Sequence, residues 1–423
     1  MSAVLSKVFC CAGNCLCHAI NNMLGDAKKI NPKLFARIGF IILSAIAVGI
    51  SLLILFYLAN ILKPFNDWIS CPKDNNFDCL GISSVYRMSF TLLVFHTLTL
   101  ILSFTSNQCA KVFNMDCWSF KILFIIVFYF SMFFVSNGFF SIYAEISRYL
   151  SILFLLYQAL VIISFGHIIN IKLVEHLDNA LDKGESACKY QFWLITLSLI
   201  FGGLTIFWFV DSIINHFTSA WNIIIIIVSI VIGILFTALS ISNIVTRKRL
   251  LTSIFIFSYV AYLCWSAMNS QPKDGAKLEL SFWDIFIGLF YLFLALGFLG
   301  FYIKKKPEVN ESEEQKQINK NPLLEEAPQE DDKEKELISE NKPEDEIDLS
   351  RAYVLFHIFM MFMSIYYCML MTNWSVIDTD SSVVLTQTWT SFWVKVSVLG
   401  STIILYIWIL IAPRIFPDRE FEF

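Results

Sequence analysis

The sequence predicts an all-α integral membrane protein with about ten transmembrane helices. Of its 423 residues, 57% are hydrophobic, 16% are aromatic and only 16% are charged, whereas soluble domains carry about 25% charged residues. The mean hydropathy is +0.65. So few charges cannot cover a water-facing surface, which excludes an ordinary soluble enzyme, a nucleic-acid-binding protein and a disordered chain.

The hydropathy pattern divides the chain into ten spans. A bilayer core of about 30 Å needs roughly 20 mostly apolar residues per helix. Between residues 122 and 171 the only charged side chains are Glu145 and Arg148. That stretch is too long for one crossing, and the turn pair Asn137-Gly138 divides it. The expected spans are residues 38–62, 88–106, 120–136, 139–171, 190–210, 221–245, 250–268, 282–303, 352–373 and 392–412.

The fourth expected span, residues 139–171, is unusually long. At 1.5 Å per residue it forms a helix of about 50 Å, against a bilayer core of about 30 Å. The helix must therefore tilt steeply or project beyond the bilayer. Because a steep helix cannot pack along its whole length against upright neighbours, we expect it to cross between groups of helices.

The basic residues indicate the orientation. If the N-terminus is cytosolic and the spans alternate, 24 of the 31 Lys and Arg residues face the cytosol and five face the opposite side. The remaining two, Arg148 and Lys395, lie within spans. This asymmetry is what the positive-inside rule expects, so both termini are predicted to be cytosolic. A plasma membrane or endomembrane location is favoured, and another organelle membrane stays open.

Four regions follow from this pattern. Residues 1–37 form a Cys-rich cytosolic segment without the apolar core of a cleavable signal peptide. Residues 38–303 hold the first eight helices, and residues 351–423 hold the last two with a short cytosolic tail. Residues 304–350 between them contain 16 of the 35 acidic residues and 8 of the 31 basic ones. Their Glu, Lys, Asn and Pro composition cannot bury enough apolar surface to fold alone, so we expect an acidic, flexible cytosolic loop.

The cysteines indicate one disulfide and one modified segment. Cys71 and Cys79 flank a short loop on the non-cytosolic side, where a disulfide is favoured over two free thiols. Four further cysteines precede the first span: Cys10, Cys11, Cys15 and Cys17. Because their spacing is not that of a paired zinc knuckle, S-acylation or plain packing is favoured over a metal site. We expect no metal and no cofactor.

The charged residues of the fourth span are the first candidates for a functional site. Glu145 and Arg148 are three residues apart, so they share a helix face and can pair, and Ser141 lies on the same face. Either charge alone at mid-bilayer costs about 2.5–3.5 kcal/mol, which implies a partner or a water-filled groove. A hydrophilic strip for a lipid headgroup or ion and a structural ion pair near the interface both fit.

Other polar residues within the spans are expected to be structural. His96, His167 and His357 lie in three different spans, where a neighbouring group usually satisfies a buried neutral histidine. Asp211, Asp284 and Lys395 lie near span ends, where their charged ends are expected to reach the interface. No hydrolase, metalloprotease or nucleotide-binding motif occurs in a suitable context, so catalysis is not expected.

Several motifs together resemble the Serinc (serine incorporator) family. They occur in order along nearly the whole chain and are densest in the last two spans. The motifs are Val85–Phe90, Tyr262–Ala267, Ser350–His357, Tyr367–Trp374, Ser391–Val396 and Tyr406–Pro413.

The resemblance implies ten helices in two bundles separated by a long oblique fourth helix. It also implies non-selective, ATP-independent phospholipid scrambling, with membrane phospholipids as partners. A headgroup cannot cross hydrocarbon cheaply, so we expect a membrane-facing polar groove lined by Glu145, Arg148 and Ser141, with Tyr353 and His357 as further candidates. Two alternatives stay open: a structural or accessory subunit of a larger membrane assembly or homo-oligomer, and an accessory for serine incorporation into phosphatidylserine and sphingolipids.

Overall fold

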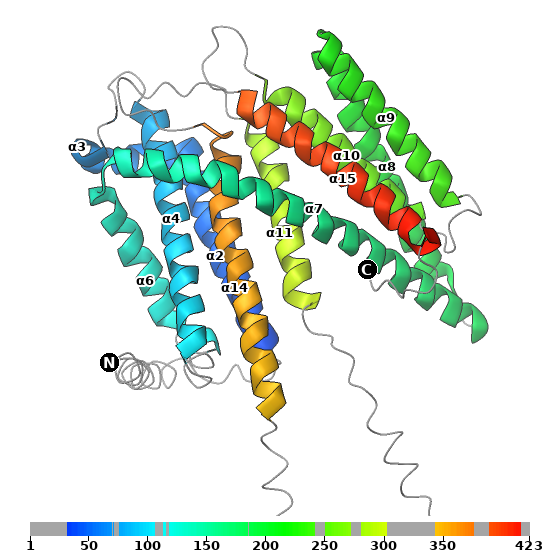
Figure 1. The fold of residues 1–423 in the computed structure, drawn as a ribbon, viewed down its shortest axis with the longest axis horizontal. Coiled ribbons are helices and arrows are strands. Elements are labelled where there is room, and N and C mark those ends of the chain that lie inside the picture. Colours follow the sequence, from blue (N-terminus) through cyan, green and yellow to red (C-terminus); the bar gives the residue numbers. More distant parts are fainter. Residues whose placement is uncertain are drawn as a thin grey trace, which may run out of the picture. The chain divides into compact units, whose positions relative to one another are not determined.

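The computed structural model describes residues 32–69, 71, 76–105, 113–115, 118–184, 186–241, 250–271, 281–302, 343–375 and 389–415. All regular elements within them are helical (Figure 1). The main helices are α2 (Pro32–Leu53), α4 (Asn76–Thr105), α6 (Trp118–Ser131), α7 (Asn137–Asp182), α8 (Cys188–His216), α9 (Ala220–Ile241), α10 (Leu250–Asn269), α11 (Phe282–Tyr302), α14 (Pro343–Met371) and α15 (Trp389–Ile415). Shorter helical turns are Ile54–Leu58, Ala59–Phe65, α3 (Asn66–Ile69) and Met132–Phe134.

The prediction of an all-α, multi-pass membrane protein is confirmed. Within the described ranges, nine helices are long and apolar enough to cross a bilayer. The third expected span corresponds to a shorter apolar helix, Trp118–Phe134, whose last turn tightens into a 3₁₀ helix. Each of the ten spans expected from hydropathy thus has a helix in the structure.

The long helix α7 extends further than the sequence analysis expected. It has 46 residues, from Asn137 to Asp182, and therefore measures about 69 Å. Asn137-Gly138 begins the helix. The non-helical residues that separate it from the preceding helix are Val135 and Ser136, just before this pair. The helix continues past residue 171 because the polar residues that follow are good helix formers, and Gly184 ends it at a φ of +67°.

The described chain belongs to two compact units. Unit 1 comprises residues 1–44, 92–127 and 299–361, and unit 2 comprises residues 45–91, 128–298 and 362–423. The boundaries fall within α2, α4, α6, α11 and α14, so each of these helices contributes a segment to both units.

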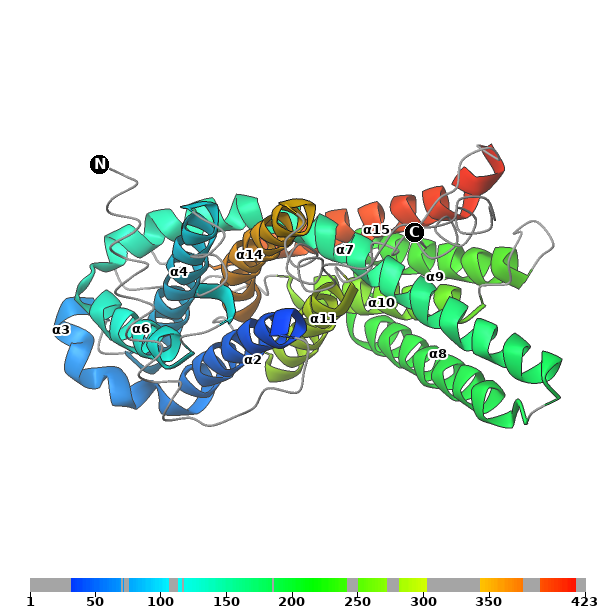
Figure 2. The ribbon, with the colours of Figure 1, turned by 90° about the horizontal axis from the view of Figure 1, so that it is seen from below.

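Unit 2 is organised around α10. This helix packs against α7, α8, α9 and α15 (Figure 2), and nearly all of its side chains are buried. The backbones of α7 and α10 approach closely at Gly166, where an added Cβ would lie 2.6 Å from the ring of Phe255. By contrast, α8 and α9 expose many apolar side chains, as lipid-facing helices do.

Unit 1 packs around Phe40 of α2. The Phe40 ring is fully buried and contacts Phe95 of α4, Trp118 of α6 and Phe356 of α14, with centroids 5.2–6.2 Å apart. Gly39 lets Trp118 lie against α2, because an added Cβ would come within 2.3 Å of the indole. Aromatic packing thus holds four helix segments together.

Candidate functional site

The charged pair predicted on the fourth span is present on α7. Arg148 donates from Nη1 to both carboxylate oxygens of Glu145, at 3.2 and 3.1 Å. The Glu145 side chain is 48% exposed and that of Arg148 16%. Exposed apolar side chains surround the pair along the helix: Ile142, Ile146, Tyr149 and Leu153. Glu145 thus places a carboxylate on an otherwise apolar helix surface, with Ser141 half-buried one turn away.

Arg148 also binds the turn that follows α14, residues 372–375, which we call the α14 turn. Its Nη2 donates to the carbonyl oxygen of Trp374 at 3.2 Å. Asn373 and Trp374 have φ values of 47° and 61°, in the left-handed region that larger side chains rarely occupy. Tyr86 of α4 also holds this turn, because its hydroxyl donates to the carbonyl of Ser375. The charged pair of α7 therefore positions a strained turn.

The α14 turn contributes to a small cavity within unit 2. The cavity measures about 20 Å³, enough for about one water molecule. Its walls come from α7, α10, α11, α14, α15 and the buried side chain of Trp374. We call it the tyrosine cavity after its most frequent lining residue: Tyr259, Tyr262, Tyr291 and Tyr366.

The expectation that Asp284 and Lys395 reach the interface is wrong. Both are buried, and Lys395 Nζ lies 3.1 Å from Asp284 Oδ2. The ammonium also donates to the carbonyl of Ser266 at 3.2 Å and to Ser270 Oγ at 2.6 Å. Asp284 accepts a further bond from Ser266 Oγ at 2.6 Å. The two charges do not need to reach water, because each satisfies the other across α10, α11 and α15.

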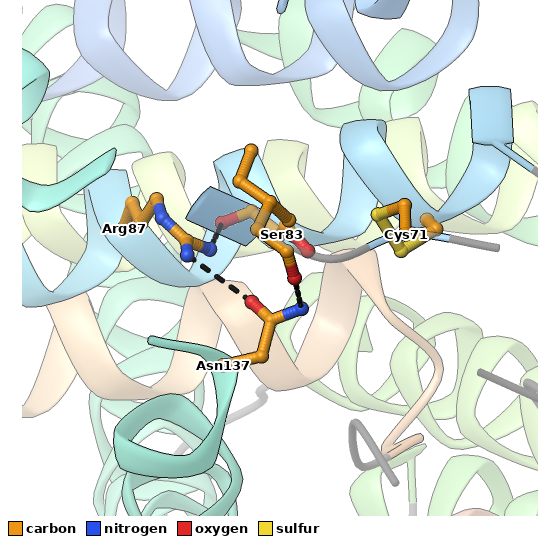
Figure 3. Close-up of a disulfide and its surroundings, with 6 residues drawn as sticks. Cys71, Ser83, Arg87 and Asn137 are labelled. Atoms are coloured by element: carbon orange, nitrogen blue, oxygen red, sulfur yellow. Dashed lines mark hydrogen bonds between the residues drawn. A yellow bond between two sulfur atoms is a disulfide. The ribbon is translucent and has the colours of Figure 1, made fainter. Parts of the chain in front are cut away.

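Arg87 of α4 is buried near the disulfide, and the sequence analysis assigned it no structural role. Arg87 donates to the carbonyls of Met132 and Val135, at 3.1 and 2.9 Å, where α6 ends. It also donates to Asn137 Oδ1 at 3.1 Å, at the start of α7 (Figure 3). The ring of Phe140 lies under its guanidinium, 4.5 Å away. Arg87 thus fixes the chain between α6 and α7.

The expected disulfide joins Cys71 and Cys79 (Figure 3). It links the end of α3 to the first turn of α4. Asn137 donates from Nδ2 to the carbonyl of Ile69 at 2.5 Å, just before Cys71. The disulfide, Asn137 and Arg87 therefore form one connected structure at the α6–α7 break.

The two histidines His96 and His357 meet in unit 1, where both are fully buried. Their Nδ1 atoms are 3.2 Å apart, and His357 Nε2 lies 2.7 Å from Asn114 Oδ1. Because Asn114 uses its amide nitrogen on Ser103 Oγ, its oxygen accepts from His357. Neutral His357 then accepts at Nδ1 from His96. A continuous hydrogen-bonded chain thus joins α4, α14 and the segment 113–115.

The predicted lipid-groove residues divide between the units. Glu145, Arg148 and Ser141 belong to unit 2, whereas Tyr353 and His357 belong to unit 1 and are buried. The Tyr353 ring lies 5.6 Å from the guanidinium of Arg37. Four predicted acylation sites lie outside the described residues: Cys10, Cys11, Cys15 and Cys17. In the part of the chain that is described, no group of three or more His, Cys, Asp or Glu residues is arranged to hold a metal.

Comparisons with known proteins agree on one family. Residues 9–419 match the family model described as Serine incorporator (Serinc). The chain is 25% identical to serine incorporator 3 of Bos taurus over 391 residues, which cover 80% of each protein. It is also 25% identical to a membrane protein of Schizosaccharomyces pombe, over 82% of this chain and 81% of the relative. A probable serine incorporator of Dictyostelium discoideum is 29% identical over 48% of this chain and 50% of its own length.

Proposed function

Because the chain belongs to the serine incorporator family, we propose that it moves phospholipids between the leaflets of a membrane without using ATP. The observation that carries this proposal is the exposed carboxylate of Glu145. It lies among exposed apolar side chains on a membrane-spanning helix, where Arg148 is its partner within the protein and its exposed side can be solvated by water or a lipid headgroup.

The charged pair supplies what a headgroup loses when it leaves water. A phospholipid headgroup carries a phosphate and, in most lipids, an ammonium group, and neither enters hydrocarbon without compensation. Glu145 and Arg148 present one charge of each sign, with Arg148 Nη1 and Glu145 Oε2 3.1 Å apart. A headgroup moving along α7 exchanges its hydration for these charges while its acyl chains remain in lipid. The lipid runs down its own gradient, so no energy source enters the mechanism.

The orientation belongs to the same proposal. The 24-to-five distribution of basic residues supports cytosolic termini, in a plasma membrane or endomembrane. Protease added to sealed, right-side-out vesicles should then leave residues 304–350 uncut. Cleavage within these residues would indicate the opposite orientation.

The names of the relatives favour a second candidate, in which the protein assists the incorporation of serine into lipids. This role would be an accessory one, without catalysis by this chain. It predicts altered synthesis of phosphatidylserine in cells but no lipid movement by the purified protein.

Scrambling by the purified protein in liposomes separates these candidates. The test variant is the double substitution Glu145→Gln with Arg148→Gln, which removes both charges and leaves neither a carboxylate nor a guanidinium without its counter-charge. The matched control is Lys172→Gln with Glu175→Gln, an equally spaced exposed pair on the same helix beyond its apolar part. We expect the control to scramble at the parent rate and the test variant to be about tenfold slower, which corresponds to 1.4 kcal/mol of barrier. A folded test variant at the parent rate would exclude the pair from transport.

A further inference from the structure

The tyrosine cavity contains an acceptor that has no donor. Gln158 of α7 lines the cavity and is only 1% exposed. Its Oε1 makes no hydrogen bond to any described residue. An unsatisfied acceptor in a buried position is destabilising and is rarely retained without a ligand or water. A ligand that donates a hydrogen bond would therefore satisfy Gln158 Oε1.

Aromatic side chains form much of the cavity wall. Four tyrosines and Trp374 line it, and aromatic faces attract cations through their quadrupole. Tyr259 and Tyr262 both pack on Tyr291, with ring centroids 5.0 and 4.9 Å away, so the rings form one cluster rather than separate contacts. Phenol oxygens also accept hydrogen bonds. Both features favour a cationic donor.

The lysine of the cavity does not offer a site for an anion. Lys395 has three N–H donors, and Ser266, Ser270 and Asp284 take them all. The carboxylate of Asp284, 3.1 Å away, also offsets the positive charge of the ammonium. An anion would have to displace one of these partners, whereas a cation needs only Gln158 and the aromatic rings.

The volume of the cavity limits the size of the cationic group that can enter it. A volume of about 20 Å³ admits a group of the size of water. A primary ammonium group has that size and three N–H donors, whereas trimethylammonium is larger and has none. We propose that the tyrosine cavity of unit 2 binds a primary ammonium group, supplied by a free amine or by an aminophospholipid headgroup. The headgroup case rests on the proposed function, and the free-amine case does not.

Thermal unfolding of the purified, full-length protein in detergent tests binding. The probes are ethanolamine hydrochloride and choline chloride at equal concentration. Ethanolamine should raise the unfolding temperature and choline should not. Gln158→Leu should abolish the ethanolamine shift, and Gln158→Glu should enlarge it, because a carboxylate binds ammonium more strongly. The control Gln191→Leu changes an exposed glutamine of α8 and should keep the parent shift. Equal shifts with both probes, or a full shift in Gln158→Leu, would overturn the proposal.

Liposomes then distinguish the two sources of the ammonium group. If headgroups enter the cavity, the ratio of phosphatidylethanolamine to phosphatidylcholine transport should exceed one in the parent and fall to about one in Gln158→Leu. If ethanolamine raises the unfolding temperature in detergent but the ratio of phosphatidylethanolamine to phosphatidylcholine transport is the same in the parent and in Gln158→Leu, the site binds a free amine. If no variant transports any lipid, the proposed function fails, and the detergent measurement still decides whether the site exists.

Discussion

The buried ion pair of unit 2 gives the sharpest prediction about stability. At 3.1 Å and an effective dielectric constant of about 20, the attraction between Lys395 and Asp284 is roughly 5 kcal/mol. Much of this offsets the cost of removing both charges from water. Replacing Lys395 alone by Met removes the attraction but leaves the carboxylate buried, with Ser266 Oγ as its remaining partner among the described side chains. We expect a loss of about 3–5 kcal/mol in the free energy of unfolding.

A second substitution should reverse much of this loss. Lys395→Met combined with Asp284→Asn leaves no charge in the site, and Asn keeps an oxygen that accepts from Ser266. We expect the double variant to recover about half of the lost stability, so the two effects should not add. The measurement is reversible unfolding of the purified protein in mixed micelles with increasing SDS.

A matched control separates loss of the ion pair from loss of a lysine. Lys189→Met removes an exposed lysine of α8, and surface changes of this kind usually alter stability by less than about 0.5 kcal/mol. A cost below about 1 kcal/mol for Lys395→Met, or a double variant as unstable as the sum of the single ones, would refute the reasoning.

Two further predictions concern the disulfide and the histidine pair. Cys71→Ser with Cys79→Ser should lower the free energy of unfolding by about 2–3 kcal/mol, the chain-entropy estimate for a loop with a sequence separation of 8. The control Cys188→Ser, at an exposed free thiol, should leave the free energy of unfolding unchanged. An equal loss of stability in both variants would contradict the estimate. His357→Ala should cost about 2–4 kcal/mol, because it removes the buried hydrogen bonds to His96 Nδ1 and Asn114 Oδ1. Leu355→Ala, at an exposed position of the same helix, should be nearly neutral. Similar unfolding of the two variants would show that the histidine chain is not stabilising.

Hydropathy and charge predicted the helices because each span must satisfy its own backbone hydrogen bonds in lipid. The Glu145–Arg148 pair was equally predictable, since a spacing of three residues places both side chains on one face. The partners of Lys395 were not predictable, because Asp284 is 111 residues away and proximity to a helix end also fits an interfacial charge. The hydrogen bond between His96 and His357 was not predictable either, because 261 residues separate the two histidines.

Three cations of unit 2 share one kind of partner, a backbone carbonyl at or near the end of a helix. Arg87 binds carbonyls at the end of α6, Arg148 binds one in the α14 turn, and Lys395 binds one in the last turn of α10. These positions are C-terminal helix ends, where unpaired carbonyls carry partial negative charge. Helix-end carbonyls thus add to the carboxylate partners of Arg148 and Lys395, and they are the main partners of Arg87.

This arrangement also explains why the charged pair of α7 differs from the other charges. Arg87 and the Lys395–Asp284 pair are buried, and backbone or side-chain partners occupy their donors. Glu145 has its two oxygens bound to Arg148, yet nearly half of its side chain remains exposed on a surface of apolar residues. A headgroup therefore meets an accessible charge at Glu145 without displacing a structural partner, whereas at the buried sites it would first have to break the fold.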